Sequence, residues 1–426
     1  MEEPRPTRAD EAGQAVRERS AARRDLTIEA AQDNGAASPD TIAARWRAPP
    51  DPPVVGSSTK GRVMRRRFLS VIAAVAALTL LAACGGNDDN GGGTSGGGGK
   101  TAKIGVILPD TKSSARWETA DKPLLEQAFK TAGVQYDIQN AQGDKTQFQT
   151  IADQMITGGA NVLMIVNLDS GTGKAVLDKA KSQGVATIDY DRLTLNGGAQ
   201  YYVSFDNVAV GTLQGEGLAK CLEAEGKKTA NIVYLNGSPT DNNATLFKQG
   251  YDGVLSKMSQ YKKVADQSVP DWNNQQAGTI FEQMYTKENG KIDGVLAAND
   301  GLGNAAIAIL KKNNANGKVP VTGQDATVQG LQNILNGDQC MTVYKAIKQE
   351  ADAAAKLAIG LAKGEQQTAP KTLKDPESGR DVPSVLLQPV AITKDNVNDV
   401  VADGFVKKSE LCAGSFASKC AAAGVE

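Results

Sequence analysis

The sequence contains no histidine among its 426 residues. Histidine is the most frequent general base in enzymes, the commonest metal ligand and the side chain whose charge changes near neutral pH. The formal net charge is only −1, so the basic excess that marks nucleic-acid binding is also lacking. We therefore expect no catalytic residue, no metal site, no cofactor and no nucleic-acid partner.

Cysteine is scarce, and no two cysteines form the CxxC spacing of a zinc ribbon or a thioredoxin motif. The chain holds Cys84, Cys221, Cys340, Cys412 and Cys420. Cys84 lies in a targeting motif described below, which leaves an even number of thiols. In an oxidising compartment four thiols favour two disulfides, whereas free buried thiols are the alternative and are commoner in cytosolic proteins.

The first hundred residues are typical of targeting rather than of a packed fold. Residues 1–63 are rich in Arg, Ala, Pro, Asp and Glu and predict disorder, or a mis-assigned start if Met64 is the true first residue. Residues 64–83 combine arginines with an apolar run that is shorter than the about 20 residues of a membrane span. Such a segment predicts a signal peptide, exported by the general route or, given its arginines, the twin-arginine route.

Leu81-Ala82-Ala83-Cys84 closes the apolar run and resembles a bacterial lipobox, in which the cysteine carries the lipid. A Gly-rich stretch from 84 to 100 follows and predicts a flexible tether. The alternative is an ordinary signal peptide with an incidental cysteine. We expect Cys84 to be lipidated and the protein to lie outside the cytoplasm, anchored to the outer face of the cell membrane.

From residue 101 the sequence alternates short apolar runs with amphipathic stretches. This alternation predicts an α/β fold with parallel sheets covered by helices. The first array has expected strands at 104–108, 134–138, 162–166 and 185–188, and expected helices at 115–131, 146–157 and 172–182. After a strand at 201–206, the second has helices at 208–224, 243–257, 274–286, 303–312 and 327–335, and strands at 230–235, 262–269, 292–297 and 319–323. Two arrays imply two Rossmann-like lobes with a cleft between them.

Polar and indole side chains follow the expected strands, where ligands bind in open α/β sheets. Carboxylates, amides, Arg and Lys can pair with sugar hydroxyls, each of which both donates and accepts a hydrogen bond. Of the three tryptophans, Trp117 and Trp272 follow Cys84, and both stand at strand ends, one in each array. A half-buried structural indole is the ordinary role of tryptophan, but this placement favours stacking on the apolar face of a sugar.

These segments resemble the type I periplasmic binding proteins and, among them, the D-xylose-binding proteins, over about residues 101–410. The resemblance is carried by motifs that include Tyr190-Asp191-Arg192, Gly237-Ser238-Pro239, Gly323-Gln324-Asp325-Ala326 and Thr342-Val343-Tyr344-Lys345. It implies the type I fold, with three crossings of the chain between the lobes, near 206–207, at 343–345 and along 386–390. It also implies that the ligand is held by Arg116, Trp117, Asp191, Arg192, Asn243, Trp272, Asn299, Asp325 and Lys345.

We accordingly divide the body into lobe 1 (101–205 plus 345–385), lobe 2 (207–342 plus 390–411) and a C-terminal tail (412–426). Helix 208–224 runs away from the cleft and the strand at 340–344 runs back towards it, so Cys221 and Cys340 should both lie at the distal end of lobe 2. Cys412 and Cys420 are close enough in sequence to close a local loop. We expect the disulfides Cys221–Cys340 and Cys412–Cys420.

Two other interpretations compete with this one. Gly301-Leu302-Gly303 opens an expected helix and fits a dinucleotide fingerprint, with Asp325 about 20 residues on, but polar residues separate it from the strand and no catalytic set accompanies it. A sugar-responsive repressor shares the fold but needs a DNA-binding N-terminus. A sensor that presents its closed form to a membrane receptor remains an alternative. The sequence predicts a monomeric, non-enzymatic component of an ABC importer that binds one monosaccharide, with D-xylose favoured, and delivers it to a permease and ATPase complex.

Overall fold

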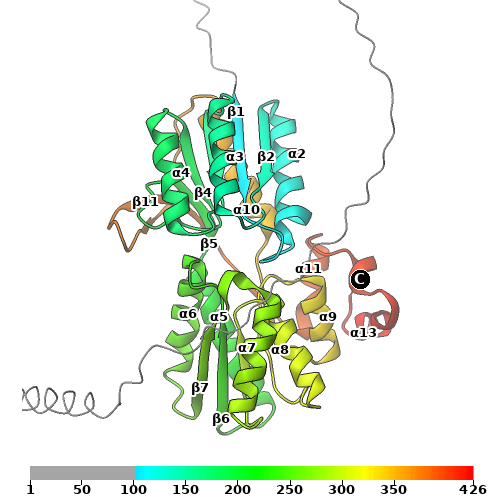
Figure 1. The fold of residues 1–426 in the computed structure, drawn as a ribbon. Coiled ribbons are helices and arrows are strands. Elements are labelled where there is room, and N and C mark those ends of the chain that lie inside the picture. The colour runs from blue at the N-terminus through cyan, green and yellow to red at the C-terminus, as the bar shows by residue number, and fades with distance from the viewer. Residues whose placement is uncertain (1–101, 426) are drawn as a thin grey trace, which may run out of the picture. The chain divides into compact units, whose positions relative to one another are not determined.

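The computed structural model describes residues 102–425. The expected N-terminal extension, signal peptide, lipidation site at Cys84 and tether lie outside the described residues. Within them, the chain builds two α/β lobes (Figure 1). None of the described helices is long and apolar enough to span a bilayer.

Lobe 1 is a seven-stranded sheet in the order β10-β11-β5-β4-β3-β1-β2. All neighbouring strands are parallel except the antiparallel pair β10 and β11. Its strands are β1 (Lys103–Leu108), β2 (Gln135–Asn140), β3 (Val162–Ile165), β4 (Ala186–Tyr190), β5 (Tyr201–Phe205), β10 (Lys371–Lys374) and β11 (Asp381–Leu387). Its helices are η1 (Trp117–Asp121), α2 (Lys122–Ala132), α3 (Lys145–Thr157), α4 (Ser170–Ser182) and α10 (Ile347–Ala362).

The central strands of lobe 1 are apolar on both faces because helices cover both. Alternate residues of a strand point to opposite faces. Val106 and Met164 accordingly belong to the core under α2 and α10, whereas Ile107 and Leu163 belong to the core under α3 and α4. This two-sided burial fixes the register of the sheet and therefore the position of the loops at its carboxyl edge.

Lobe 2 is built on a parallel three-stranded sheet in the order β7-β6-β8. Its elements are α5 (Asn207–Ala224), β6 (Ala230–Asn236), α6 (Asn242–Leu255), β7 (Tyr261–Ser268), η2 (Pro270–Trp272), α7 (Asn274–Lys287), β8 (Gly294–Ala297), α8 (Asp300–Lys312), α9 (Val328–Asn336), β9 (Thr342–Tyr344) and β12 (Val390–Ile392). Helices α5 and α6 pack closely because of glycine. A Cβ at Gly211 would lie 1.9 Å from the carbonyl oxygen of Phe247, so no larger residue fits there.

The chain passes between the lobes three times. It leaves β5 for α5 at Asp206, leaves β9 for α10 at Lys345, and leaves β11 for β12 between Leu387 and Val390. The predicted three-crossing hinge is confirmed. Because each crossing follows the carboxyl end of a strand, hinge residues such as Lys345 lie beside the loops that line the cleft.

Two elements differ from the prediction. The strand expected at 319–323 is reduced to a single bridge between Val321 and Val295. The backbone of this segment bonds Val295 on both sides, but at Ala297 the hydroxyl of Thr322 takes the place of the backbone. Its Oγ1 accepts from the Ala297 nitrogen at 3.0 Å and donates to the Ala297 oxygen at 3.1 Å. The helix expected at 115–131 begins with the π-helical turn η1. Pro123, in the first turn of α2, has no N–H to continue a regular hydrogen-bond pattern.

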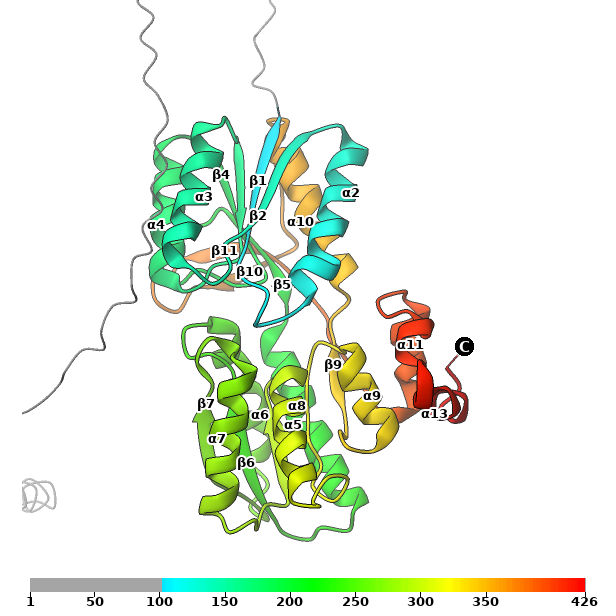
Figure 2. The same ribbon diagram turned by 45° about the vertical axis from the view of Figure 1, so that its right-hand side comes forward.

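The expected C-terminal tail at 412–426 is folded within the described residues. The chain ends in η3 (Lys394–Asn396), α11 (Val397–Ala402), α12 (Lys408–Leu411), η4 (Gly414–Phe416) and α13 (Ala417–Ala422). Its apolar residues, among them Leu411 and Val425, share a core with Leu331 and Leu335 of α9. Figure 2 shows these helices beside α9. Small residues that lack a clear apolar period can thus cover an existing helix.

The structure pairs Cys221 with Cys340, with Cα atoms 6.4 Å apart, and Cys412 with Cys420, with Cα atoms 5.8 Å apart. These are the two pairs expected from the sequence. Cys221 lies in the last two turns of α5 and Cys340 precedes β9, so this pair joins two segments of lobe 2. The pair Cys412–Cys420 closes the short segment that carries η4.

Candidate functional site

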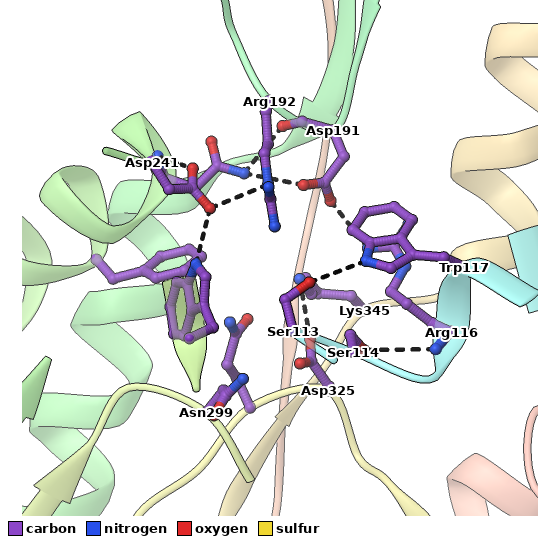
Figure 3. A pocket seen from close by; sticks show the side chains of 14 residues that line it. Ser113, Ser114, Arg116, Trp117, Asp191, Arg192, Asp241, Asn299, Asp325 and Lys345 are labelled. Carbon is purple, nitrogen blue, oxygen red and sulfur yellow. Dashed lines mark hydrogen bonds and ion pairs between the residues drawn. The ribbon is translucent and has the colours of Figure 1, made fainter. Parts of the chain in front are cut away.

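One cavity between the lobes brings together every residue that the sequence proposed for ligand binding (Figure 3). The space among its lining side chains is about 330 Å³, including the part that is open to solvent. Lobe 1 and the hinge contribute Arg116, Trp117, Asp191, Arg192 and Lys345, and lobe 2 contributes Asn243, Trp272, Asn299 and Asp325.

Five further lining residues were not proposed from the sequence: Ser113, Ser114, Asp241, Phe247 and Gln324. Asp241 and Gln324 belong to strand-end segments that the sequence singled out, so the segments were identified but these members of them were not. Phe247 follows Asn243 by one helical turn of α6 and therefore shares its face. Asp206 caps α5 by accepting from the Ala209 nitrogen at 3.0 Å, and it does not line the cavity.

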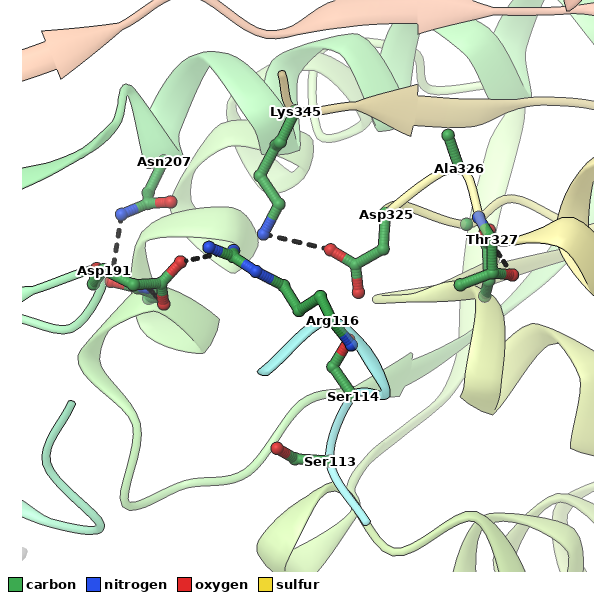
Figure 4. A network of polar contacts seen from close by, with 12 residues as sticks. Ser113, Ser114, Arg116, Asp191, Asn207, Asp325, Ala326, Thr327 and Lys345 are labelled. Carbon is green, nitrogen blue, oxygen red and sulfur yellow. Dashed lines mark hydrogen bonds and ion pairs between the residues drawn. The ribbon is translucent and has the colours of Figure 1, made fainter. Parts of the chain in front are cut away.

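Arg116 is held by three acidic side chains. Its Nε donates to Asp121 Oδ2 at 2.8 Å, its Nη1 to Asp191 Oδ2 at 2.8 Å, and its Nη2 to Asp121 Oδ1 at 2.7 Å and Glu350 Oε2 at 2.5 Å. A guanidinium has five N–H donors, so these four bonds leave one donor on Nη1. Arg116 can offer a ligand at most that donor. Its main task is to hold Asp191 in place (Figure 4).

The charges around Arg116 set the protonation of the carboxylates. Burial alone would raise the pKa of Asp191, but Arg116, Lys345 and Arg192 outweigh it, so the pKa of Asp191 lies below its ordinary value. Asp191 is therefore ionised at neutral pH and accepts hydrogen bonds only. Glu350, by contrast, is fully buried, and this burial raises its pKa to about 8 despite the nearby Arg116.

A second cation comes from the hinge. Lys345 is 5% exposed, and its Nζ lies 3.0 Å from Asp325 Oδ1 of lobe 2 (Figure 4). Burial tends to lower the pKa of Lys345, but the charges of Asp325 and Asp191 raise it above its ordinary value. The ammonium keeps its charge and can donate to a ligand oxygen as well as to Asp325, since it has three donors.

Two sets of contacts cross the cleft at the site. Asn243 of lobe 2 donates through Nδ2 to the carbonyl oxygen of Asp191 at 2.9 Å and to its Oδ1 at 3.1 Å. Arg192 of lobe 1 pairs through Nε with Asp241 Oδ2 of lobe 2 at 3.0 Å. The same polar groups that line the cavity therefore also bring the lobes together, which couples the geometry of the site to closure of the cleft.

Two indoles form apolar walls. Trp117 donates from Nε1 to Ser113 Oγ at 3.2 Å, and the guanidinium of Arg116 lies 4.4 Å from its ring centroid. Trp272 donates from Nε1 to Asp241 Oδ2 at 3.1 Å. Its ring rests on Gly237, where a Cβ would lie 2.1 Å from Cη2. These contacts fix both rings, and a fixed aromatic face can stack on the C–H face of a ring-shaped ligand.

Three segments at the site adopt left-handed backbone conformations that L-residues seldom use. Asp191 has φ 61°, Asp271 and Trp272 have φ 53° and 54°, and Asp325 has φ 95°. Such conformations persist only where the surroundings hold them, and they concentrate at functional sites. Each of these segments follows a strand or loop end and brings at least one side chain to the lining of the cavity.

Gln324, which lines the cavity, has a buried acceptor without a hydrogen-bond partner within residues 102–425. Gln324 is 3% exposed, and its Oε1 makes no hydrogen bond there. Buried polar atoms without partners are rare in native proteins. A ligand hydroxyl that donates to Gln324 would satisfy it. The site thus offers ionised acceptors, amide groups, cationic donors and two indole faces.

Comparisons with known proteins agree with this architecture. A family profile for the periplasmic binding protein domain matches residues 104–366, and the chain belongs to that family. The chain is 36% identical over 316 residues to a D-xylose-binding periplasmic protein of Escherichia coli K12, a match that covers 73% of this chain and 93% of that protein. It is 35% identical to a D-xylose-binding periplasmic protein of Haemophilus influenzae, over 73% and 92% of the two chains.

A solved structure of an ABC transporter solute-binding protein from Clostridium phytofermentans, with bound β-D-glucose, is also similar. It superimposes with a TM-score of 0.66 at 27% identity and covers 72% of this chain and 99% of that one. The relatives and the fold neighbours are solute-binding proteins. The predicted fold class, family and absence of enzymatic activity are confirmed.

Proposed function

We propose that this chain is the extracytoplasmic binding component of an ABC importer and that its ligand is a monosaccharide, D-xylose. The observation that carries the proposal is the cavity itself, a space of about 330 Å³ with indole walls and a charged, amide-rich shell drawn from both lobes and the hinge. A neutral pyranose suits this set, because every hydroxyl can both donate and accept. The D-xylose-binding relatives at 36% and 35% identity support the choice of sugar.

The residues take distinct roles in this proposal. Asp191 and Asp325 accept hydrogen bonds from sugar hydroxyls, since the first is ionised and the second is paired with Lys345. Asn299 keeps its amide Nδ2 for the sugar, because its Oδ1 caps α8 by accepting from the Leu302 nitrogen at 2.9 Å. Trp117 and Trp272 cover the apolar faces of the ring. Arg116 acts mainly by orienting Asp191.

Binding proceeds by hinge closure. The three crossings lie beside the cavity, so a rotation at 206, 345 and the segment between Leu387 and Val390 opens or closes the cleft with little change inside either lobe. Sugar binds to one wall, and closure brings Asn243 and Asp241 of lobe 2 against Asp191 and Arg192 of lobe 1. The permease then recognises the closed form.

Isothermal titration of the purified protein, from Cys84 onward, with D-xylose, L-arabinose, D-ribose, D-glucose and D-galactose tests the proposal. D-Xylose should bind at one molecule per chain and more tightly than the other sugars. Tighter binding of another sugar in the panel would identify that sugar as the ligand in place of D-xylose. Binding of none of them would refute the monosaccharide function.

The lipoprotein anchor and the import partners also belong to this proposal. Leu81-Ala82-Ala83-Cys84 supports attachment of the mature protein to the membrane through Cys84, with residues 85–100 as the tether. The permease and ATPase are inferred from the ABC transporter context of a similar solved protein. We propose that the protein acts as a monomer, since a type I lobe pair contains the whole cavity.

A further inference from the structure

Asp300 is a buried acid next to the ligand cavity. It follows Asn299, which lines the cavity, but it does not line the cavity itself. It is the first residue of α8. Burial raises its pKa to about 6, so the group is ionised at neutral pH. A buried charge is costly unless hydrogen bonds compensate for it, and the bonds that Asp300 makes therefore identify what this charge holds in place.

Four donors surround its two carboxylate oxygens. Oδ2 accepts from the backbone nitrogen of Thr327 at 2.8 Å and from the hydroxyl of the same residue at 3.0 Å. Oδ1 accepts from the hydroxyl of Thr342 and from Nε2 of Gln339, both at 2.8 Å. Glycine makes room for the carboxylate, since a Cβ at Gly323 would lie 2.1 Å from Oδ1 and a Cβ at Gly330 would lie 2.3 Å from Oδ2. The surrounding chain is thus closely fitted to a carboxylate at this position.

One oxygen of Asp300 supports the turn that carries Asp325. Asp325 and Ala326 have φ 95° and 48°, a left-handed conformation that persists only where the surroundings hold it. Thr327 follows this turn directly, and both its backbone nitrogen and its hydroxyl are bonded to Asp300. On the other side of the turn, the backbone nitrogen of Asp300 donates to the carbonyl oxygen of Gln324 at 3.0 Å. The turn is therefore fixed to Asp300 at both ends.

The other oxygen supports the hinge strand that carries Lys345. Thr342 begins β9, which leads to Lys345. The Thr342 hydroxyl donates to Asp300 and accepts from the Ala326 nitrogen at 3.3 Å, so it joins the strand to the turn. The two segments carry the Asp325 and Lys345 side chains, which form the ion pair at the cavity (Figure 4). One carboxylate thus holds the backbone on both sides of that pair.

We propose that Asp300 is a positioning residue for sugar binding. Its carboxylate, which does not line the cavity, fixes the Asp325 turn to the hinge strand and so sets the position of Asp325 against Lys345. This inference rests on the proposed function, in which Asp325 accepts a hydrogen bond from the sugar. A neutral amide cannot replace the carboxylate, because an amide has one acceptor oxygen and its NH₂ group would face two donors.

Titration calorimetry with D-xylose tests the proposal, with the fold of each variant checked by circular dichroism. Asp300→Asn should weaken D-xylose binding about tenfold. Because Asp300 acts through Asp325, the same change should have a much smaller effect in an Asp325→Ala background, whereas a general loosening of lobe 2 would add to the effect of Asp325→Ala. Asp338→Asn is the matched control. Asp338 is also buried in lobe 2, but it is held by Asn316 and Lys311 and does not line the cavity. Its variant should lower the melting temperature and leave the affinity unchanged.

Thr342 provides a second test that keeps the carboxylate. Thr342→Val replaces the hydroxyl that joins the strand to the turn by a methyl group of similar size. It should weaken D-xylose binding about three- to tenfold. Thr342→Ser restores the hydroxyl and should recover the affinity.

Normal affinity in Asp300→Asn, or in Thr342→Val if Asp300→Asn does not fold, would refute the positioning role while the sugar-binding function stands. An equal loss from Asp300→Asn with and without Asp325→Ala would also refute it, and so would equal losses in Thr342→Val and Thr342→Ser, which would assign the effect to packing. If the unmodified protein binds no sugar, the proposed function fails and this inference fails with it.

Discussion

Arg192 and Asp241 form an ion pair across the cleft, with Nε of the first 3.0 Å from Oδ2 of the second. The same Oδ2 accepts the indole N–H of Trp272 at 3.1 Å, and the ring of Trp117 lies 5.8 Å from the guanidinium of Arg192. Trp272 is therefore hydrogen-bonded to one member of the ion pair that joins the lobes, and Trp117 lies beside the other member. Loss of either charge should therefore disturb closure and the sugar-binding walls together.

Arg192→Ala and Asp325→Ala should each weaken sugar binding about ten- to hundredfold while leaving the lobes folded, because removing one member of a buried, charge-assisted pair typically costs about 1–3 kcal/mol. Titration calorimetry measures the affinity and circular dichroism the fold. Arg380→Ala is the matched arginine control, since Arg380 lies after β10 and bonds the Ala199 oxygen outside the cavity. Near-normal affinity in both site variants would place the ligand elsewhere.

Sugar should change the intrinsic tryptophan emission of the mature protein. From Cys84 onward the only tryptophans are Trp117 and Trp272, and both line the cavity. We expect saturation of the signal with the same affinity that calorimetry gives, and a smaller change in Trp272→Phe, which keeps an aromatic ring against Gly237. An emission spectrum that stays constant while calorimetry reports binding would contradict the stacking role of the indoles.

The sequence predicted the cavity better than it predicted the contacts inside it. Strand ends can be identified from apolar runs, and parallel strands bring their carboxyl ends to one edge of each sheet. Because both edges face the cleft, the sequence alone suffices to group Asp191 of lobe 1 with Asn299 and Asp325 of lobe 2. Glu350 could not be placed with them. It lies 234 residues from Arg116, on a helix that only the second crossing returns to lobe 1, and in sequence it resembles an ordinary acid in a first helical turn.

The errors of the fold prediction also arise from contacts between residues that are distant in the sequence. The strand expected at 319–323 has the right apolar residues, but beyond Val295 the side chain of Thr322, and not its backbone, bonds Ala297. The strand β10 forms the edge of the lobe 1 sheet and β11 lies next to it. Both lack a long apolar run, and both are partly exposed. Local pattern identifies central elements, whereas edges and termini depend on what they pack against.

The two disulfides should contribute unequally to stability. In the chain-entropy model a closed loop stabilises by restricting the unfolded chain, and the loops here have separations of 119 and 8 residues. That model gives about 5 kcal/mol for the long loop and about 2.5 kcal/mol for the short one. Cys221→Ser with Cys340→Ser should therefore lower the melting temperature more than Cys412→Ser with Cys420→Ser.

Neither double variant should alter sugar affinity, because no cysteine lines the cavity. Peptide mapping without reductant checks the pairing directly. Recovery of Cys221 and Cys340 as free thiols from the exported protein would contradict the first pair.

Cys84→Ala should release the protein from the membrane fraction of the cells that produce it, if Cys84 carries the lipid. Cell fractionation and immunoblotting measure the distribution, and Ser95→Ala in the tether serves as the control. Sugar affinity should stay the same in both variants, since the tether precedes β1. Retention of Cys84→Ala in the membrane fraction would refute the lipoprotein anchor.

The stability of the protein should fall as the pH rises from about 5 to 8, because buried carboxyls keep their protons in the folded state. Burial raises the pKa of Glu350 to about 8, of Asp189 to about 7 and of Asp300 to about 6. In this window the unfolded chain has already lost these protons, whereas the folded chain releases each one only as the pH passes the raised pKa of that group. The folded state then binds more protons, so the free energy of unfolding decreases with increasing pH.

Glu350→Gln isolates the largest of these effects. The amide is neutral at every pH and can still accept from Arg116, so the variant should fold and show a weaker decline in melting temperature between pH 5 and 8. The groups that act on Glu350 are Arg116, Asp191, Asp121 and Lys345, and none of them is removed by the change. Glu126→Gln, on the partly exposed side of α2, is the control and should follow the unmodified protein. An unchanged decline in Glu350→Gln would show that Glu350 is ionised in the folded protein, and the ion pair with Arg116 would then stabilise the site throughout this pH range.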